Sequence, residues 1–135
     1  MKRTGNYGHS QSEETKNRLR VSAVKQFKLR PYESAFNTFL LNAKRRSIET
    51  NITFENFLEL TKVTECTYCN APIEWPDYNV RKHQGHNLDR KDNSRGYLFN
   101  NVVVCCWFCN NLKGSRLTYE QMLQVGALIR SWRKP

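Results

Sequence analysis

Two pairs of cysteines have the spacing of a metal-binding site. Each pair has the form C-x-x-C, and 36 residues separate the first pair from the second. Two such turns bring four sulfurs to one ion, which is the closed tetrahedron typical of structural zinc. Buried, unligated thiols or a redox pair are the disfavoured alternatives. We therefore predict a structural Zn²⁺ whose ligands are Cys66, Cys69, Cys106 and Cys109. The fifth cysteine, Cys105, follows an apolar run and is predicted to be a buried filler.

The chain is strongly basic, with a formal net charge of +10 over 135 residues. Residues 1–48 hold 11 Lys/Arg and 3 Asp/Glu, a net of +8, and residues 49–135 supply the other +2. This balance indicates a polyanionic partner such as nucleic acid, although a merely soluble basic protein remains an alternative. We expect no signal peptide, no membrane partner and a cytoplasmic location, where thiols bind metals more readily than they form disulfides.

The elements that must position these residues are mainly helical in the first half of the chain. A capping box at Ser10 predicts a helix from about Gln11 to Phe27 that is basic and not buried. Pro31 fits the first position of a second helix, and Thr53 caps a third. In the second half, we expect an extended segment at 86–91, a turn at 92–96 and a strand at 102–104.

The second cysteine pair follows that strand, and a helix is predicted to start just after it. A further capping box, Thr118-x-x-Gln121, opens a last helix with an apolar face. That face is expected to contain Met122, Val125, Leu128, Ile129 and Trp132. Ile73 and Trp75 follow the first cysteine pair and are expected to pack beside the zinc.

The stretch from about Cys66 to Lys113 resembles the HNH, or ββα-metal, endonucleases. It looks closest to a phage-type group with the pattern LDRxDN…GY…NVV…CxxCNxxK. The carrying residues are Leu88-Asp89-Arg90-Lys91-Asp92-Asn93, Gly96-Tyr97, Asn101-Val102-Val103, Cys106-x-x-Cys109-Asn110 and Lys113. The resemblance implies an α+β fold with a small zinc-stabilised, treble-clef-like ββα-metal core at 64–117. This core would lie in a nuclease domain of residues 31–135 with flanking helices.

The same resemblance implies a second, catalytic ion, Mg²⁺ or Mn²⁺, bound to oxygen ligands. Asp89, at the end of the first strand, and Asn110, at the start of the helix, would hold it, and Asn101 would shape the loop between them. Lys113 would steady a phosphate oxygen. Asp89 as a turn cap and Asn110 as a helix N-cap are the structural alternatives. The implied reaction is hydrolysis of double-stranded DNA to 5′-phosphate and 3′-hydroxyl ends, in a phage-type homing or nicking enzyme. Monomer or dimer remains open.

The sequence departs from the family's best-known form, in which a histidine follows the aspartate and acts as general base. Arg90 occupies that position and stays protonated near neutral pH. Three alternatives remain: His86 is the base, Asp92 is the base, or the ion activates water while Arg90 stabilises the phosphate. We favour the third alternative. Regular strand alternation would place His86 and Arg90 on the face opposite Asp89.

Residues 1–30 form a basic arm that resembles nuclease-associated modular DNA-binding motifs of the NUMOD type. The carrying residues begin at Asn6 and end in Ser12-Glu13-Glu14-Thr15-Lys16. Candidate phosphate contacts are Lys16, Arg18 and Arg20 in the arm and Lys44, Arg45 and Arg46 at a helix end. An ordinary capped surface helix and a solvated helix end are the alternatives. The rival functions are a zinc-ribbon DNA-binding module without catalysis and a restriction or junction-resolving HNH nuclease.

Overall fold

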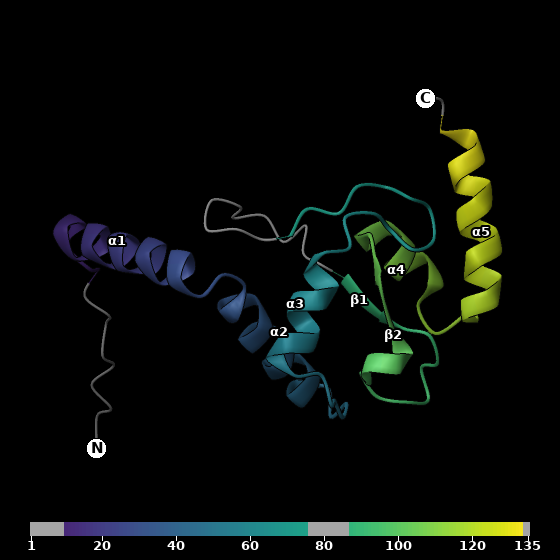
Figure 1. The fold of residues 1–135 in the computed structure, drawn as a ribbon, viewed down its shortest axis with the longest axis horizontal. Helices are drawn as coiled ribbons and strands as arrows, with labels where there is room; N and C mark the ends of the chain where they lie inside the picture. Colours follow the sequence, from purple (N-terminus) through teal and green to yellow (C-terminus); the bar gives the residue numbers. More distant parts are fainter. Residues whose placement is uncertain (1–9, 76–86, 134–135) are drawn as a thin grey trace, which may run out of the picture.

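The computed structural model describes residues 10–75 and 87–133 (Figure 1). The predicted extended residue His86 lies outside these ranges. The elements, in chain order, are the helices α1 (Glu13–Leu29), α2 (Glu33–Arg45) and α3 (Phe54–Thr61), the strand β1 (Asn87–Arg90), the 3₁₀ turn η1 (Phe99–Asn101), the strand β2 (Val102–Cys105), and the helices α4 (Trp107–Lys113) and α5 (Tyr119–Trp132). The chain is therefore α+β, as predicted. Among the described residues, no helix has the length and apolar character needed to cross a bilayer.

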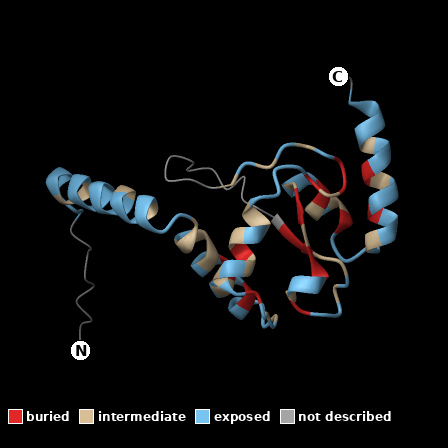
Figure 2. Cartoon of the chain, viewed as in Figure 1, coloured by how far each residue is buried: buried red, intermediate tan, exposed pale blue. Residues whose placement is uncertain are grey.

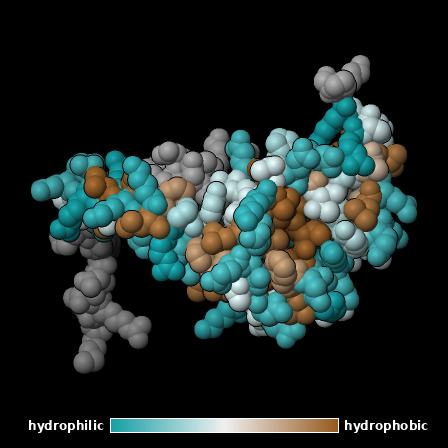
Figure 3. All heavy atoms as spheres, in the orientation of Figure 1, coloured by the Kyte–Doolittle hydropathy of each residue, from teal (hydrophilic) through white to brown (hydrophobic). Residues whose placement is uncertain are grey.

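Helix α1 extends away from the rest of the chain (Figure 1). It has no buried residue, and hydrophilic side chains cover most of it (Figures 2 and 3). The helix begins two residues later than predicted, because Ser12 and not Ser10 is its N-cap. The Ser12 hydroxyl accepts a hydrogen bond from the backbone N–H of Thr15 at 3.2 Å. The predicted exposure of this basic helix is confirmed.

Helix α2 does not begin at Pro31, as the sequence predicted. Tyr32 has a left-handed backbone, with φ of 69°, and α2 starts only at Glu33. A non-glycine residue in this region interrupts the helical path, so Pro31 lies in the turn between α1 and α2. An ion pair of 2.9 Å between Arg30 and Glu33 spans the turn.

Helices α2 and α3 pack on one face of the β1–β2 hairpin and form a first hydrophobic cluster. Thr53 caps α3 as predicted: its hydroxyl accepts the N–H of Asn56, and the side-chain oxygen of Asn56 accepts the N–H of Thr53. The buried members are Phe39, Ile52, Phe57, Leu88, Val102 and Val104. Trp75 packs here against Phe57, not beside the cysteines as predicted, because its indole N–H donates to the carbonyl of Val63 at 2.7 Å. Ile73 touches both this cluster and the one around the cysteines.

The hairpin separates the two clusters. Strands β1 and β2 are antiparallel, with Leu88 opposite Val104 and Asp89 opposite Val103. Because side chains alternate along a strand, Leu88 joins the first cluster and Asp89 points to the other face. The second cluster contains Cys66, Tyr68, Cys69, Cys105, Cys109 and Met122. Buried residues accordingly concentrate around the hairpin and the adjoining helices (Figure 2).

Helix α5 covers the second cluster. Its predicted capping box between Thr118 and Gln121 is present. Met122 and Gly126 are its buried residues, whereas the side chains of Leu128 and Trp132 are 53% and 72% exposed. Val125 and Ile129 also pack against the second cluster, so the predicted face is confirmed for Met122, Val125 and Ile129 and wrong for Leu128 and Trp132. The helix approaches the chain most closely at Gly126. A Cβ atom at this position would lie 2.2 Å from the carbonyl oxygen of Tyr68.

We predict that Gly126→Ala destabilises the protein by about 1–3 kcal/mol, because the added methyl group must push α5 away from Tyr68. Helix propensity alone would give the opposite sign, since alanine favours a helix interior by roughly 1 kcal/mol. Urea denaturation measures the difference, and the exposed Gln124→Ala variant of the same helix is the control. A variant as stable as the parent would contradict the close contact.

Candidate functional site

The four paired cysteines converge on one point. Their sulfur atoms all lie within 4.8 Å of one another, and the sulfurs of Cys69 and Cys106 are 3.8 Å apart. A tetrahedral zinc ion with Zn–S bonds of about 2.3 Å requires sulfur separations of roughly 3.8 Å. The predicted convergence is confirmed, and the group could hold a metal ion. Cys105 lies outside the group, and burial, followed by the charge of Asp89, raises the pKa of its thiol. Cys105 is itself fully buried, so the predicted buried filler is also confirmed.

Local backbone geometry shapes each cysteine pair. In the first, Asn70 adopts a left-handed conformation with φ of 57°, and its N–H donates to the carbonyl of Cys66 at 2.9 Å. In the second, the sulfur of Cys106 accepts the N–H of Cys109 at 3.4 Å and caps α4. The helix therefore starts inside the second pair, at Trp107, and not after it as predicted. A sulfur that caps a helix also becomes fixed in position.

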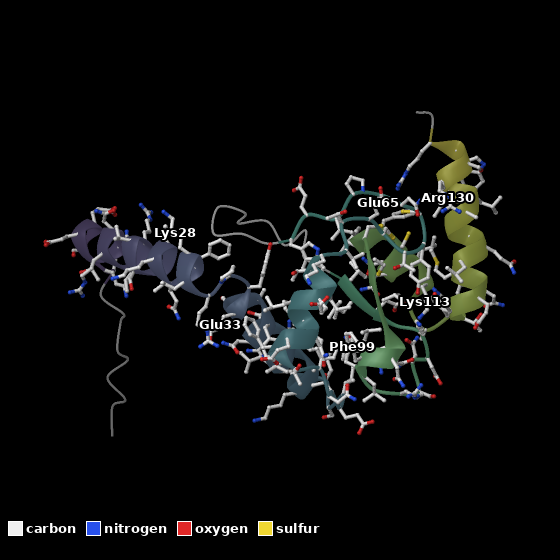
Figure 4. The ribbon with its side chains drawn as sticks, viewed as in Figure 1. Lys28, Glu33, Glu65, Phe99, Lys113 and Arg130 are labelled. Atoms are coloured by element: carbon white, nitrogen blue, oxygen red, sulfur yellow. The ribbon has the colours of Figure 1, made fainter. Side chains whose placement is uncertain are left out.

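The C-terminal end of α5 brings two arginines to the first cysteine pair and to Asn70 after it, Arg130 in the helix and Arg133 just beyond it. Arg133 Nη1 lies 3.4 Å from the sulfur of Cys69 and 3.4 Å from its carbonyl oxygen. Arg130, which is labelled in Figure 4, donates from Nη1 to Asn70 Oδ1 at 3.2 Å. A guanidinium beside a thiolate ligand offsets part of the cluster's negative charge. Sequence reasoning missed both residues, because no spacing signal links α5 to a turn some 60 residues earlier.

Asp89 is buried, with 6% of its surface exposed. Its Oδ2 accepts a hydrogen bond of 2.5 Å from the hydroxyl of Tyr68, which lies inside the first cysteine pair. Burial, together with this bond to Asp89, raises the pKa of the Tyr68 phenol well above its ordinary range, so the hydroxyl keeps its proton and donates. Tyr68 was not a sequence-predicted site residue. An aromatic between two metal ligands was its one visible signal.

Lys113 provides the second partner of Asp89. Its ammonium lies 3.3 Å from Oδ1 and 3.3 Å from Oδ2 of the carboxylate and donates to the carbonyl of Arg90 at 2.8 Å. The side chain is wholly buried. The expected phosphate contact requires an exposed ammonium. The structure instead places this group beneath Asp89, on the inner side of the hairpin.

Asn110 lies on α4, and Asn101 lies in the 3₁₀ turn before β2. Asn110 is the fourth residue of α4, half-buried, and three residues before Lys113, so the two side chains share a helix face. It is not the N-cap, since Cys106 is. Asn101 is buried, and its amide donates to the carbonyls of Asp92 and Gly96 while its oxygen accepts the N–H of Asp92. This geometry agrees with the expected loop-shaping role of Asn101.

Arg90 is held by the turn that follows β1. Its Nη1 donates to the carbonyls of Asn93 and Arg95, each at 3.0 Å, and its guanidinium lies 5.4 Å from the centre of the Tyr97 ring. Both hydrogen bonds leave from one terminal nitrogen, so the remaining N–H groups are not used by them. Asp92 is exposed. Hydrogen bonds from the Ser94 hydroxyl and N–H lower the pKa of Asp92, which weakens it as a base.

The predicted phosphate contacts lie on two separate elements. Arg46, after the end of α2, donates to the Tyr97 hydroxyl at 3.0 Å, so it lies on the same tyrosine as Arg90. Lys44 and Arg45 are exposed beside it. On α1, Arg18 and Arg20 are exposed, and Lys16 pairs with Glu13 at 2.7 Å. The α2 end therefore adjoins the turn after β1, whereas the α1 residues lie on the extended helix.

Comparison with known proteins supports this architecture. No family model matches the chain. A curated relative, the uncharacterised protein R423 of Acanthamoeba polyphaga mimivirus, is 26% identical over 97 residues, which are 72% of this chain and 15% of the relative. The chain therefore spans about a seventh of that protein. The rare-cutting HNH restriction endonuclease PacI is similar in structure, with a TM-score of 0.59 and 21% identity over 72% of this chain and 75% of PacI. The chain thus has a fold like that of an HNH endonuclease, with four clustered cysteines.

We predict one zinc ion per chain by metal analysis of the purified protein. Cys106→Ser should lose both the ion and cooperative folding, because this sulfur is a ligand and also the cap of α4. Cys105→Ala is the matched control, because Cys105 is buried next to Cys106 but its sulfur is not one of the four that converge. Retention of full metal content by Cys106→Ser would contradict the four-sulfur site.

Proposed function

We propose that this chain is a metal-dependent DNA endonuclease of the HNH class. The observation that carries the proposal is the position of Asp89, which the hairpin presents to the same helix, α4, that carries Asn110. Zinc bound by the four cysteines would fix this hairpin and helix relative to each other. The net charge of +10 favours a nucleic-acid substrate.

The donor set suits a hard divalent ion, Mg²⁺ or Mn²⁺. A carboxylate has about four lone-pair sites, so the bonds from Tyr68 and Lys113 leave Asp89 with accepting capacity. Asn110 supplies an amide oxygen from the neighbouring helix face, and both groups are ligands that such ions prefer. When bound, the ion would supply positive charge to the scissile phosphate and activate water. Asn101 holds the turn between the two ligands.

For the proton acceptor, we favour ion-activated water over a protein base. Arg90 cannot accept a proton, and hydrogen bonds make Asp92 a weaker base than an ordinary aspartate. The N–H groups of Arg90 beyond Nη1 can stabilise the charge on the phosphate. His86 lies outside the described residues and is the alternative base.

The basic surfaces support DNA binding in two places. Residues 1–30, with Lys16, Arg18 and Arg20, would form a DNA-binding arm, and residues 31–135 would form the nuclease domain. Near the site, Lys44 and Arg45 would bind phosphates, with Arg46 set against Tyr97. A single site of this kind cuts one strand, so we propose a nicking enzyme of the phage-type homing group unless the chain dimerises. A restriction or junction-resolving role would use the same site.

One observation favours a zinc-stabilised DNA-binding module without catalysis. Asp89 is 6% exposed and already has a cationic partner, which lowers its need for an ion. The two functions differ in one result, because the binding module would bind DNA and leave it uncut with every divalent ion.

We predict that Mg²⁺ or Mn²⁺ converts supercoiled plasmid to the relaxed form in the presence of this protein. Asp89→Asn and Asn110→Ala should each abolish cleavage, because each removes a ligand, while DNA binding measured by gel shift persists. Asparagine is chosen at position 89 because it keeps the shape of the buried side chain. Asn111→Ala, next to Asn110 on the exposed side of α4, is the control and should still cut. Intact plasmid with wild-type protein under all ions would reject the enzyme.

We further predict that Arg90→Ala lowers the cleavage rate by about 10²-fold, through loss of charge at the phosphate, and that Arg90→Lys recovers part of it. His86→Ala should stay within a few-fold of the wild-type rate. Single-turnover rates measured from pH 5.5 to 9 test this order, with melting temperatures to check that the turn is intact. The reverse result, an inactive His86→Ala and an active Arg90→Ala, would make His86 the base.

A further inference from the structure

The most unusual charge in the described structure is the ammonium of Lys113. None of its side chain is meaningfully exposed, and Figure 4 shows it between the hairpin and α5. Its Nζ lies 2.8 Å from Arg90 O, 3.3 Å from Asp89 Oδ1 and 3.5 Å from Asn93 Oδ1. An ammonium has three N–H groups, and oxygens of three residues lie within reach of them. A buried cation is tolerated only with such compensation, so this position is built for the charge.

The carboxylate is equally well matched to this cation. Lys113 Nζ is 3.3 Å from both Asp89 oxygens, so the positive charge is centred on the carboxylate and does not favour one oxygen. Tyr68 adds an uncharged donor on Oδ2. The buried pair therefore carries no net charge before any divalent ion is present.

We propose that Lys113 is the internal counter-ion of Asp89. It neutralises and orients the carboxylate in the absence of a divalent ion, and its ammonium competes with that ion for the same two oxygens. The counter-ion role follows from the buried geometry alone, whereas the competition rests on the proposed function. Two cations at one carboxylate repel each other, so the ion binds more weakly than it would beside a neutral side chain at position 113.

The counter-ion role is tested by a double-variant cycle on the zinc-loaded full chain in buffer without other divalent ions. Lys113→Met keeps the aliphatic stem but leaves the Asp89 carboxylate buried and unpaired, so the melting temperature should fall by roughly 10 °C. Asp89→Asn combined with Lys113→Met removes both charges and should recover most of that loss. Lys62→Met, at an exposed pair with Glu59, is the control and should change the melting temperature little.

Two results would overturn the counter-ion role. One is a Lys113→Met variant that melts within about 2 °C of the parent, since a missing buried counter-ion must cost more than that. The other is a double variant no more stable than Lys113→Met. If Lys113→Met fails to fold, a folded double variant supports the proposal and an unfolded one overturns it.

The competition is tested by titrating Mn²⁺ into the same zinc-loaded proteins and following free Mn²⁺ by its electron paramagnetic resonance signal. Lys113→Met should bind Mn²⁺ at least about tenfold more tightly than wild type, because the repelling charge is gone. Asp89→Asn combined with Lys113→Met, which leaves no buried charge unpaired, should lose binding at this site. Equal affinities in wild type and Lys113→Met would overturn the competition. Absence of Mn²⁺ binding in every variant would reject the proposed catalytic ion as well, while the melting temperatures would still decide the counter-ion role independently.

Discussion

The buried carboxylate of Asp89 requires hydrogen-bond donors and a counter-charge, and the surrounding elements are arranged to supply them. A negative charge with 6% exposure must be compensated by nearby donors, and the chain provides two of them next to the cysteine pairs. Tyr68 comes from inside the first pair, and Lys113 comes from the helix that the second pair opens. One metal ion would fix both pairs. It would therefore also fix Tyr68 and Lys113, and through them the Asp89 carboxylate, which is not itself a ligand of that ion. Loss of the cysteine-bound metal would therefore be expected to displace the candidate catalytic carboxylate as well.

Because side chains alternate along a strand, one face of the hairpin packs in the hydrophobic core and the other face carries the candidate site. Leu88 faces the aromatic cluster beneath α2 and α3, while Asp89 faces Tyr68 of the first cysteine pair and Lys113 of α4. Shifting the pairing by one residue would exchange these faces and bury the carboxylate among phenylalanines. Asn101 fixes the turn that joins the strands, through three hydrogen bonds of its side chain. The register that buries the core is therefore also the register that presents the candidate site.

Local signals in the sequence predicted much of this arrangement. The two cysteine pairs, the caps at Thr53 and Thr118 and the strand before Cys105 all depend on neighbours within a few residues. Sequence reasoning failed where the deciding contact is distant in the chain. Trp75 is held by a hydrogen bond from its indole to the carbonyl of Val63, and Lys113 is held by Asp89, 24 residues away. A lysine at helical spacing from Asn110 looks like a surface cation until the strand above it is known. The left-handed Tyr32 had no signal at all, since nothing in its residue type favours that conformation.

The length of helix α1 can be compared with the length of a DNA duplex. Its 17 residues at 1.5 Å each span about 25 Å, and one base pair of B-form DNA rises about 3.4 Å. A helix of this length covers roughly seven base pairs, well over half a turn of the duplex. Because the turn at Tyr32 sends α1 away from the hairpin, any contacts made by its far end with a bound duplex would lie outside the proposed site of cutting. In the proposed nuclease, the arm would set the footprint of the protein on DNA and the hairpin would set the place of the cut.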